Sequence, residues 1–103
     1  MKAAPSSLVD LEMARNIARR ILAGSGAKAT LFGSRARGGD ARQWSDIDLA
    51  VDCAESTSRS VLAELREAYE ESNLLLNVDV VDLRDASAEI RAAVQREGIP
   101  WID

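Results

Sequence analysis

Three stretches of this chain have the three-four spacing of apolar residues that is typical of a helix with one buried face. The first begins near Ser7, the second begins after Ser56 or Thr57, and the third covers about Ser87 to Glu97. The residues assigned to the buried faces are Ala14, Ile17, Ala18, Ile21, Leu22, Val61, Leu62, Leu65, Ala68, Tyr69, Ile90 and Val94. The residues expected to begin or end these helices are Ser7, Gly24, Ser56 or Thr57, Ser87, Gly98 and Pro100.

Three short strands are predicted between these helices. Lys28 to Phe32 is a short apolar run, whereas Asp46 to Asp52 and Leu74 to Leu83 alternate apolar with polar residues. A brief helical turn is expected at residues 34 to 38. The predicted order is therefore α-β-α-β-α-β-α, which is typical of a small α/β (α+β) fold. The 103 residues are expected to form one domain, 1–103.

The second predicted strand carries two carboxylates that are separated by one residue. Because successive side chains on a strand point to opposite faces, Asp46 and Asp48 project the same way and Ile47 points toward the core. At about 6.6 Å, two such charges repel by roughly 2 to 3 kcal/mol at an effective dielectric of ~20, and a bound cation would offset this. The chain has no histidine. Oxygen ligands alone favour Mg²⁺ or Mn²⁺ over Zn²⁺.

The third predicted strand carries two further acids on opposite faces. The alternation places Asp79 on one face and Asp82 on the other, so only one of them can face the acidic pair. We interpret Asp82, and Asp52 at the end of the second strand, as structural or solvated residues.

A turn of small residues follows the first predicted strand. Gly33 and Ser34 come at the carboxyl end of that strand, where α/β folds usually bind ligands. Glycine lets a backbone approach phosphate closely, and hydroxyl and N–H groups can hold it. The nearby Arg35, Arg37 and Arg42 could form a positive patch. The alternative is that they are solvated loop residues.

The composition excludes several classes of function. The formal net charge of −4 provides no general attraction to nucleic acid. The single cysteine, Cys53, cannot form an intrachain disulfide and fits a reducing compartment, most simply as a buried, inert thiol. No apolar run approaches the ~18 to 20 residues of a membrane span, and the first residues lack the pattern of a secretory signal. We therefore expect a cytoplasmic protein.

The linked set of Gly33-Ser34, Asp46-Ile47-Asp48 and Asp79 resembles the motif of the minimal nucleotidyltransferases of the DNA polymerase beta-like superfamily. In that motif, Gly-Ser precedes Asp-x-Asp, and a lone Asp follows on a later strand. The resemblance covers essentially the whole chain. It implies the nucleotidyltransferase fold, a small mixed β-sheet backed by helices.

The resemblance also implies roles for the three acids. Asp46, Asp48 and Asp79 would be catalytic and would hold two Mg²⁺ ions, which align a nucleoside triphosphate with an acceptor hydroxyl. Asp46 and Asp48 would bind the triphosphate through the metals. Asp79 would bind the catalytic metal and help to deprotonate the acceptor.

The turn has a corresponding implied role in binding the nucleotide. The Ser34 hydroxyl and the local N–H groups would hold the β- and γ-phosphates, and Gly33 would let them approach the backbone. Arg35 and Arg37 are candidate phosphate contacts, with a slight preference for Arg37.

Small stand-alone chains of this kind resemble the MNT antitoxins, which are encoded beside HEPN-domain RNase toxins and transfer AMP from ATP to a toxin tyrosine hydroxyl. The resemblance therefore implies an adenylyltransferase with ATP as substrate, Mg²⁺ as cofactor and a HEPN-domain toxin as partner in a hetero-oligomer. No direct contact with nucleic acid or membrane is expected. Two alternatives stay open: an antitoxin that neutralises its partner by binding alone, and the catalytic subunit of a two-chain transferase for a small molecule.

Overall fold

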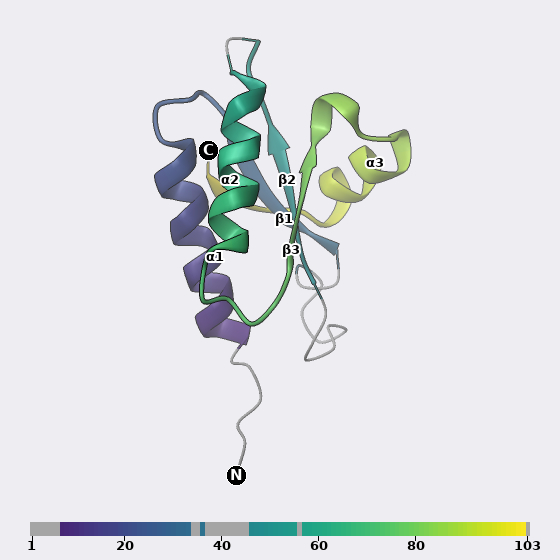
Figure 1. The fold of residues 1–103 in the computed structure, drawn as a ribbon. Coiled ribbons are helices and arrows are strands. Elements are labelled where there is room, and N and C mark those ends of the chain that lie inside the picture. The colour runs from purple at the N-terminus through teal and green to yellow at the C-terminus, as the bar shows by residue number, and fades with distance from the viewer. Residues whose placement is uncertain (1–6, 34–35, 37–45, 56, 103) are drawn as a thin grey trace.

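The computed structural model describes residues 7–33, 36, 46–55 and 57–102 (Figure 1). The described part of the chain forms three α-helices and four short strands. The elements in chain order are α1 (Ser7–Leu22), β1 (Lys28–Phe32), β2 (Ile47–Asp52), α2 (Arg59–Glu70), β3 (Val78–Asp82), a 3-10 helix (Leu83–Asp85), α3 (Ala88–Glu97) and β4 (Ile99–Ile102).

The strands form one four-stranded sheet in the order β3-β2-β1-β4. β1 pairs antiparallel with β2 and with β4, whereas β2 and β3 run parallel. The sheet is therefore mixed, which confirms the expected fold class. β2 lies in the interior of the sheet, and β3 forms one edge.

Helices cover both faces of the sheet. α1 packs against α2 and α2 packs against β3, while α3 contacts β1 (Figure 1). The side chains of Ile47, Leu49 and Val51 are fully buried, and Ala50, on the opposite face, is 1% exposed. The core therefore continues through β2 to both faces. This central strand holds its first carboxylate, Asp48, in a fixed place.

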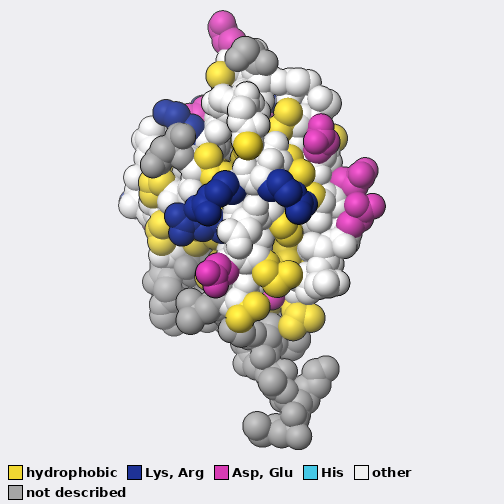
Figure 2. Space-filling model, turned by 90° about the vertical axis from the view of Figure 1, so that its left-hand side faces the viewer, with side chains coloured by type: hydrophobic (Ala, Val, Ile, Leu, Met, Phe, Trp, Pro, Cys, Tyr) yellow, Lys and Arg dark blue, Asp and Glu magenta, His cyan; other side chains and the backbone are white. Residues whose placement is uncertain are grey.

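The helices agree with the predicted apolar faces, with one exception. Tyr69 is buried as expected, and its hydroxyl donates a hydrogen bond to the Ala14 carbonyl at 2.8 Å. The arginines of α1 at positions 15, 19 and 20 are exposed. Figure 2 shows the molecule from the side on which α1 lies, and Lys and Arg side chains gather on this face. In α3, however, Ile90 and Val94 are only half-buried, and no residue of this helix is fully buried.

The structure corrects several predicted boundaries. β3 spans five residues rather than Leu74 to Leu83, because Leu75 and Leu76 donate their N–H groups to a side chain of α1 and not to a neighbouring strand. The N-cap of α2 is Ser58, whose hydroxyl accepts the Ser60 N–H, rather than Ser56 or Thr57. The N-cap of α3 is Ser87 and its end is Gly98, as predicted.

One strand was not predicted at all. Residues Ile99–Ile102 form β4 beyond the expected end of the last helix and pair with β1, with Thr30 opposite Pro100. Proline cannot donate to a strand ladder, but it is tolerated on an edge strand, where one side of the backbone needs no partner. The predicted helical turn at 34 to 38 lies mostly outside the described residues; within them, the Ala36 N–H donates to the Gly33 carbonyl at 3.1 Å.

No helix in the described part of the chain is both long and apolar enough to cross a membrane.

Candidate active site

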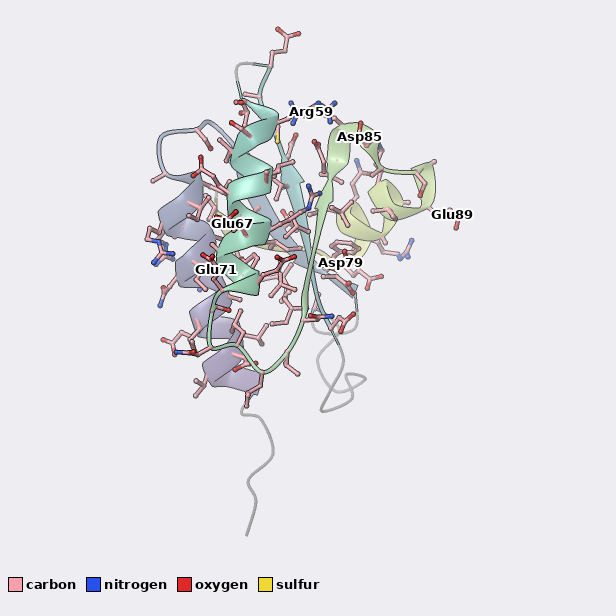
Figure 3. All side chains as sticks on the ribbon, in the orientation of Figure 1. Arg59, Glu67, Glu71, Asp79, Asp85 and Glu89 are labelled. Atoms are coloured by element: carbon pink, nitrogen blue, oxygen red, sulfur yellow. The ribbon has the colours of Figure 1, made fainter. Side chains whose placement is uncertain are left out.

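Two of the predicted acids face each other across neighbouring strands. Asp48 on β2 is the register partner of Asp79 on β3, so both side chains project from the same face of the sheet. Asp48 is half-buried and Asp79 is exposed near the start of β3 (Figure 3). Because neighbouring strands lie about 4.8 Å apart, two carboxylates here repel by roughly 3 kcal/mol at an effective dielectric of ~20. This pairing is the densest concentration of negative charge that the strand register creates.

The third acid, Asp46, precedes β2 by one residue. It is exposed, and it lines the same groove as Asp79. The expected strand began at Asp46, whereas β2 begins at Ile47, whose N–H donates to the Asn77 carbonyl at 2.8 Å. Asp46 therefore lies just before the first residue of β2, outside the ladder of β2 and β3.

The turn after β1 brings its backbone against Asp48. Gly33 has a φ of +76°, which side chains of L-residues rarely adopt. A Cβ placed at Gly33 would overlap the Asp48 Oδ2 atom and lie 3.2 Å from its Cγ. Phe32, the residue before the turn, is the register partner of Asp48. Glycine is thus required here for two reasons, backbone conformation and the space taken by the carboxylate.

The other predicted phosphate-binding residues, Ser34, Arg35 and Arg37, lie outside the described residues, as does Arg42. Their roles stay predictions. The position of Gly33 shows only that this segment starts beside the Asp48 carboxylate.

The donor set suits a hard cation such as Mg²⁺, although the described residues alone do not form a complete site. The facing carboxylates of Asp48 and Asp79 offer only oxygen atoms. Among the described residues, no three acidic, cysteine or histidine side chains lie close enough together to hold a metal ion. A metal would therefore be held by the Asp48–Asp79 pair with further oxygens, from Asp46 after a side-chain movement or from the nucleotide.

The fourth acid near this region, Asp82, belongs to a separate structural network. Its side chain is 5% exposed and forms an ion pair with Arg84 at 2.9 Å, and a longer one with Arg59 at 3.4 Å. It also accepts the Arg84 N–H at 2.9 Å and so caps the 3-10 helix. The hydrogen bond from the Arg84 side chain holds the pKa of Asp82 below its usual value. The interpretation of Asp82 as structural is confirmed.

A groove of about 570 Å³ opens beside the acids. Asp46 and Asp79 lie along it, and its other walls come from α2 and from the segment that connects α2 to β3. The pocket was not predicted from the sequence, because its walls come from segments that only the fold brings together.

Residues 26–102 match the family described as "Polymerase beta, Nucleotidyltransferase". The chain belongs to this nucleotidyltransferase family.

Within the nucleotidyltransferases, the chain is similar to a curated relative and to several solved structures. The chain is 35% identical over 65 residues to the "Probable protein adenylyltransferase MntA" of Haemophilus influenzae, a match that covers 63% of this chain and 56% of that protein. It resembles a solved minimal nucleotidyltransferase with 35% identity and a TM-score of 0.72, over 95% of this chain and 99% of the other.

Two structures of complexes are also similar. One, a toxin-antitoxin with AMP-PNP, has 32% identity and a TM-score of 0.64 over 84% of this chain and 71% of the other. The second is a tri-AMPylated HEPN toxin of Shewanella oneidensis in complex with its MNT antitoxin, with 26% identity and a TM-score of 0.59 over 87% and 70%. Chains similar to this one therefore occur in a toxin-antitoxin complex with AMP-PNP and in a complex of an MNT antitoxin with a HEPN toxin.

One residue that supports this candidate site was not predicted from the sequence. Asp10 of α1 is 3% exposed and accepts the N–H groups of Leu75 at 3.0 Å and Leu76 at 2.9 Å. It thereby fixes the segment that leads into β3 and Asp79. The sequence did indicate such a role. Asp10 lies on the same helical face as the buried Ala14, and a buried acid needs a hydrogen-bond or ion-pair partner.

Proposed function

We propose that this chain is a Mg²⁺-dependent nucleotidyltransferase that acts as an antitoxin by transferring AMP from ATP to a tyrosine hydroxyl of a cognate HEPN-domain toxin. The observation that carries the proposal is the facing pair of Asp48 and Asp79 beside the Gly33 turn. The activity and the partner come from the similar MntA protein and from the complex with an AMPylated HEPN toxin. The proposal treats residues 1–103 as one nucleotidyltransferase domain within a hetero-oligomer.

The reaction needs little covalent chemistry from the protein. The acceptor oxygen forms a bond to the α-phosphorus of ATP, the bond from that phosphorus to the pyrophosphate oxygen breaks, and the hydroxyl proton leaves. Magnesium, when bound, would supply positive charge for the attacking and leaving oxygens. Asp48 and Asp79, with Asp46 beside them, would hold the metal.

The chain's own residues would also orient the reactants. Gly33 would let phosphate approach the backbone of the turn beside the Asp48 carboxylate, and Ser34, Arg35 and Arg37 would bind the phosphates. Asp79, which is exposed beside the groove, would accept the proton of the acceptor hydroxyl.

A matched pair of variants tests this proposal. Asp48→Asn removes one facing charge, whereas Asp52→Asn makes the same change at an exposed acid on the same strand. Each protein is incubated with ATP labelled at the α-phosphate, Mg²⁺ and a HEPN-domain protein encoded beside its gene. Wild type and Asp52→Asn should label the HEPN protein, and Asp48→Asn should label it at least about 10²-fold more slowly.

The alternative is an antitoxin that acts by binding alone. In that case the chain would bind the HEPN protein without labelling it, and the Asp48→Asn variant would rescue growth from the toxin as well as wild type does. Label on a small molecule instead of the HEPN protein would contradict both candidates.

A further inference from the structure

We propose that the groove beside Asp79, which we call the acceptor groove, binds the polypeptide segment of the protein substrate that carries the acceptor hydroxyl. The acceptor groove is the 570 Å³ pocket between α2 and residues 72–80. This inference rests on the proposed function and assigns the substrate to one surface of the same site.

The order of the strands places this groove opposite the nucleotide turn. Along one end of the sheet, Asp79 on β3, Asp48 on β2 and the Gly33 turn after β1 follow one another. In an in-line displacement, the attacking and leaving oxygens lie on opposite sides of phosphorus. With the triphosphate at the Gly33 turn, the acceptor hydroxyl therefore enters from the Asp79 side, where the groove opens.

The walls of the groove are held in place by two long-range contacts. Buried Asp10 bonds to the backbone of Leu75 and Leu76, and the Arg66 guanidinium donates to the Val80 carbonyl at 3.0 Å. Because these segments are already ordered, binding does not have to order them, and less conformational entropy is lost. Such a loss would otherwise weaken the binding of a short substrate segment.

The Arg66 contact also excludes one way of binding. β3 is an edge strand, and an edge strand can take up an additional strand through its free carbonyl and N–H groups. Here Arg66 already occupies the carbonyl of Val80, in the middle of β3. The substrate segment is therefore held by side-chain contacts rather than by extension of the sheet.

The groove indicates the chemistry of that segment. Leu75, on its wall, is 63% exposed, which is high for a large apolar side chain and offers an apolar contact. Asp46 and Asp79 are the proposed metal ligands, so Glu70 is the acid on the groove wall that is available to pair with a basic residue of the substrate. The matching segment carries an apolar residue and a basic residue near its hydroxyl-bearing residue.

Two neighbouring acids on α2 provide a matched test. Glu70 lines the acceptor groove, whereas Glu71 lines a separate pocket between α1 and α2, away from Asp79 (Figure 3). Both are exposed, so a lysine at either position should leave the fold intact. Leu75→Glu tests the apolar contact, and Ile99→Glu, at a 45% exposed residue on the opposite edge strand, is its control.

The measurements are the KM for the HEPN protein in the labelling reaction, the Kd of the complex, and the rise in melting temperature caused by Mg²⁺ and ATP. We expect Glu70→Lys and Leu75→Glu each to raise the KM and the Kd for the HEPN protein by about tenfold or more, with an unchanged response to Mg²⁺ and ATP. Glu71→Lys and Ile99→Glu should match wild type in all three measurements.

Two results would overturn the assignment of the groove. One is an unchanged KM and Kd in both groove variants; the other is a loss of the ATP response in them, which would place the nucleotide in the groove. If wild type binds the HEPN protein without labelling it, the proposed activity fails, and the Kd values alone then decide whether the groove binds the partner. If wild type does not bind the HEPN protein at all, both proposals fail.

Discussion

Asp79 and Asp82 allow a direct test of which face of β3 carries the chemistry. They lie three residues apart on one strand, and Asp79 faces Asp48 while Asp82 faces the opposite side. The same substitution, aspartate to asparagine, can be made at both positions. The structure predicts opposite outcomes, a loss of activity at one and a loss of stability at the other.

The expected magnitudes follow from the contacts. Asp82 is 5% exposed and makes charge-assisted bonds with Arg84, each of a kind that contributes about 1.5 to 3 kcal/mol. Asp82→Asn retains one acceptor oxygen, and Arg84, at 27% exposure, can turn toward water, so the net loss should stay near that range. For a domain of this size, such a loss lowers the melting temperature by roughly 6 to 24 °C. Asp79 is exposed, so Asp79→Asn should not destabilise the fold. Because it removes the repulsion with Asp48, the metal-free variant should be as stable as wild type or more stable, by up to about 3 kcal/mol.

The assay combines thermal unfolding, followed by circular dichroism, with AMP transfer from labelled ATP at a temperature below both midpoints. Asp79→Asn should melt no earlier than wild type and transfer AMP at least about 10² to 10³-fold more slowly. Asp82→Asn should melt early and transfer at nearly the wild-type rate. An inactive Asp82→Asn beside an active Asp79→Asn would show that the wrong face of β3 had been assigned.

Three other predictions concern the turn, the core and the response to acid. Gly33→Ala should lower stability by about 1 to 2 kcal/mol, because alanine is strained at the positive φ of this position. It should also reduce the rise in melting temperature caused by Mg²⁺ and ATP, because the added Cβ displaces the Asp48 carboxylate. An unchanged rise would contradict the role assigned to the turn. Tyr69→Phe should lower stability by about 0.5 to 1.5 kcal/mol, measured by urea unfolding, without slowing AMP transfer, because it loses only the hydrogen bond to Ala14. The pKa of Asp82 is lowered in the folded protein, so the ionised carboxylate stabilises the fold; this contribution is present above the pKa of the unfolded state and is lost as the pH falls through the pKa of the folded state. Between about pH 6 and about pH 3, Asp82→Asn should therefore lose less stability than wild type. Parallel curves of stability against pH for the two proteins would contradict this.

The strand prediction shows which features are local. The alternation of side chains is a property of the extended backbone, so the opposite faces of Asp79 and Asp82 follow from sequence spacing alone. The shared direction predicted for Asp46 and Asp48 stays a prediction, because β2 begins only at Ile47. β1 was predicted over its exact residues, Lys28–Phe32, since its apolar run has no competing pattern. The burial of Tyr69 likewise follows from the helical spacing of its neighbours.

Tertiary structure decided the features that join distant segments. The residues of β4 include Pro100 and an exposed Ile99, a weak local signal, and they form a strand because β1 has an edge to pair with. Asp10 lies 65 residues from Leu75 along the chain, so no local pattern could link them. The pairing of β2 with its two neighbouring strands sets Asp48 opposite Asp79 and places Gly33 beside Asp48. The sequence by itself thus determined that Asp79 and Asp82 lie on opposite faces of one strand. The packed sheet determined which of them faces Asp48 and how close the two come, because register and distance between strands depend on pairing and not on spacing along the chain.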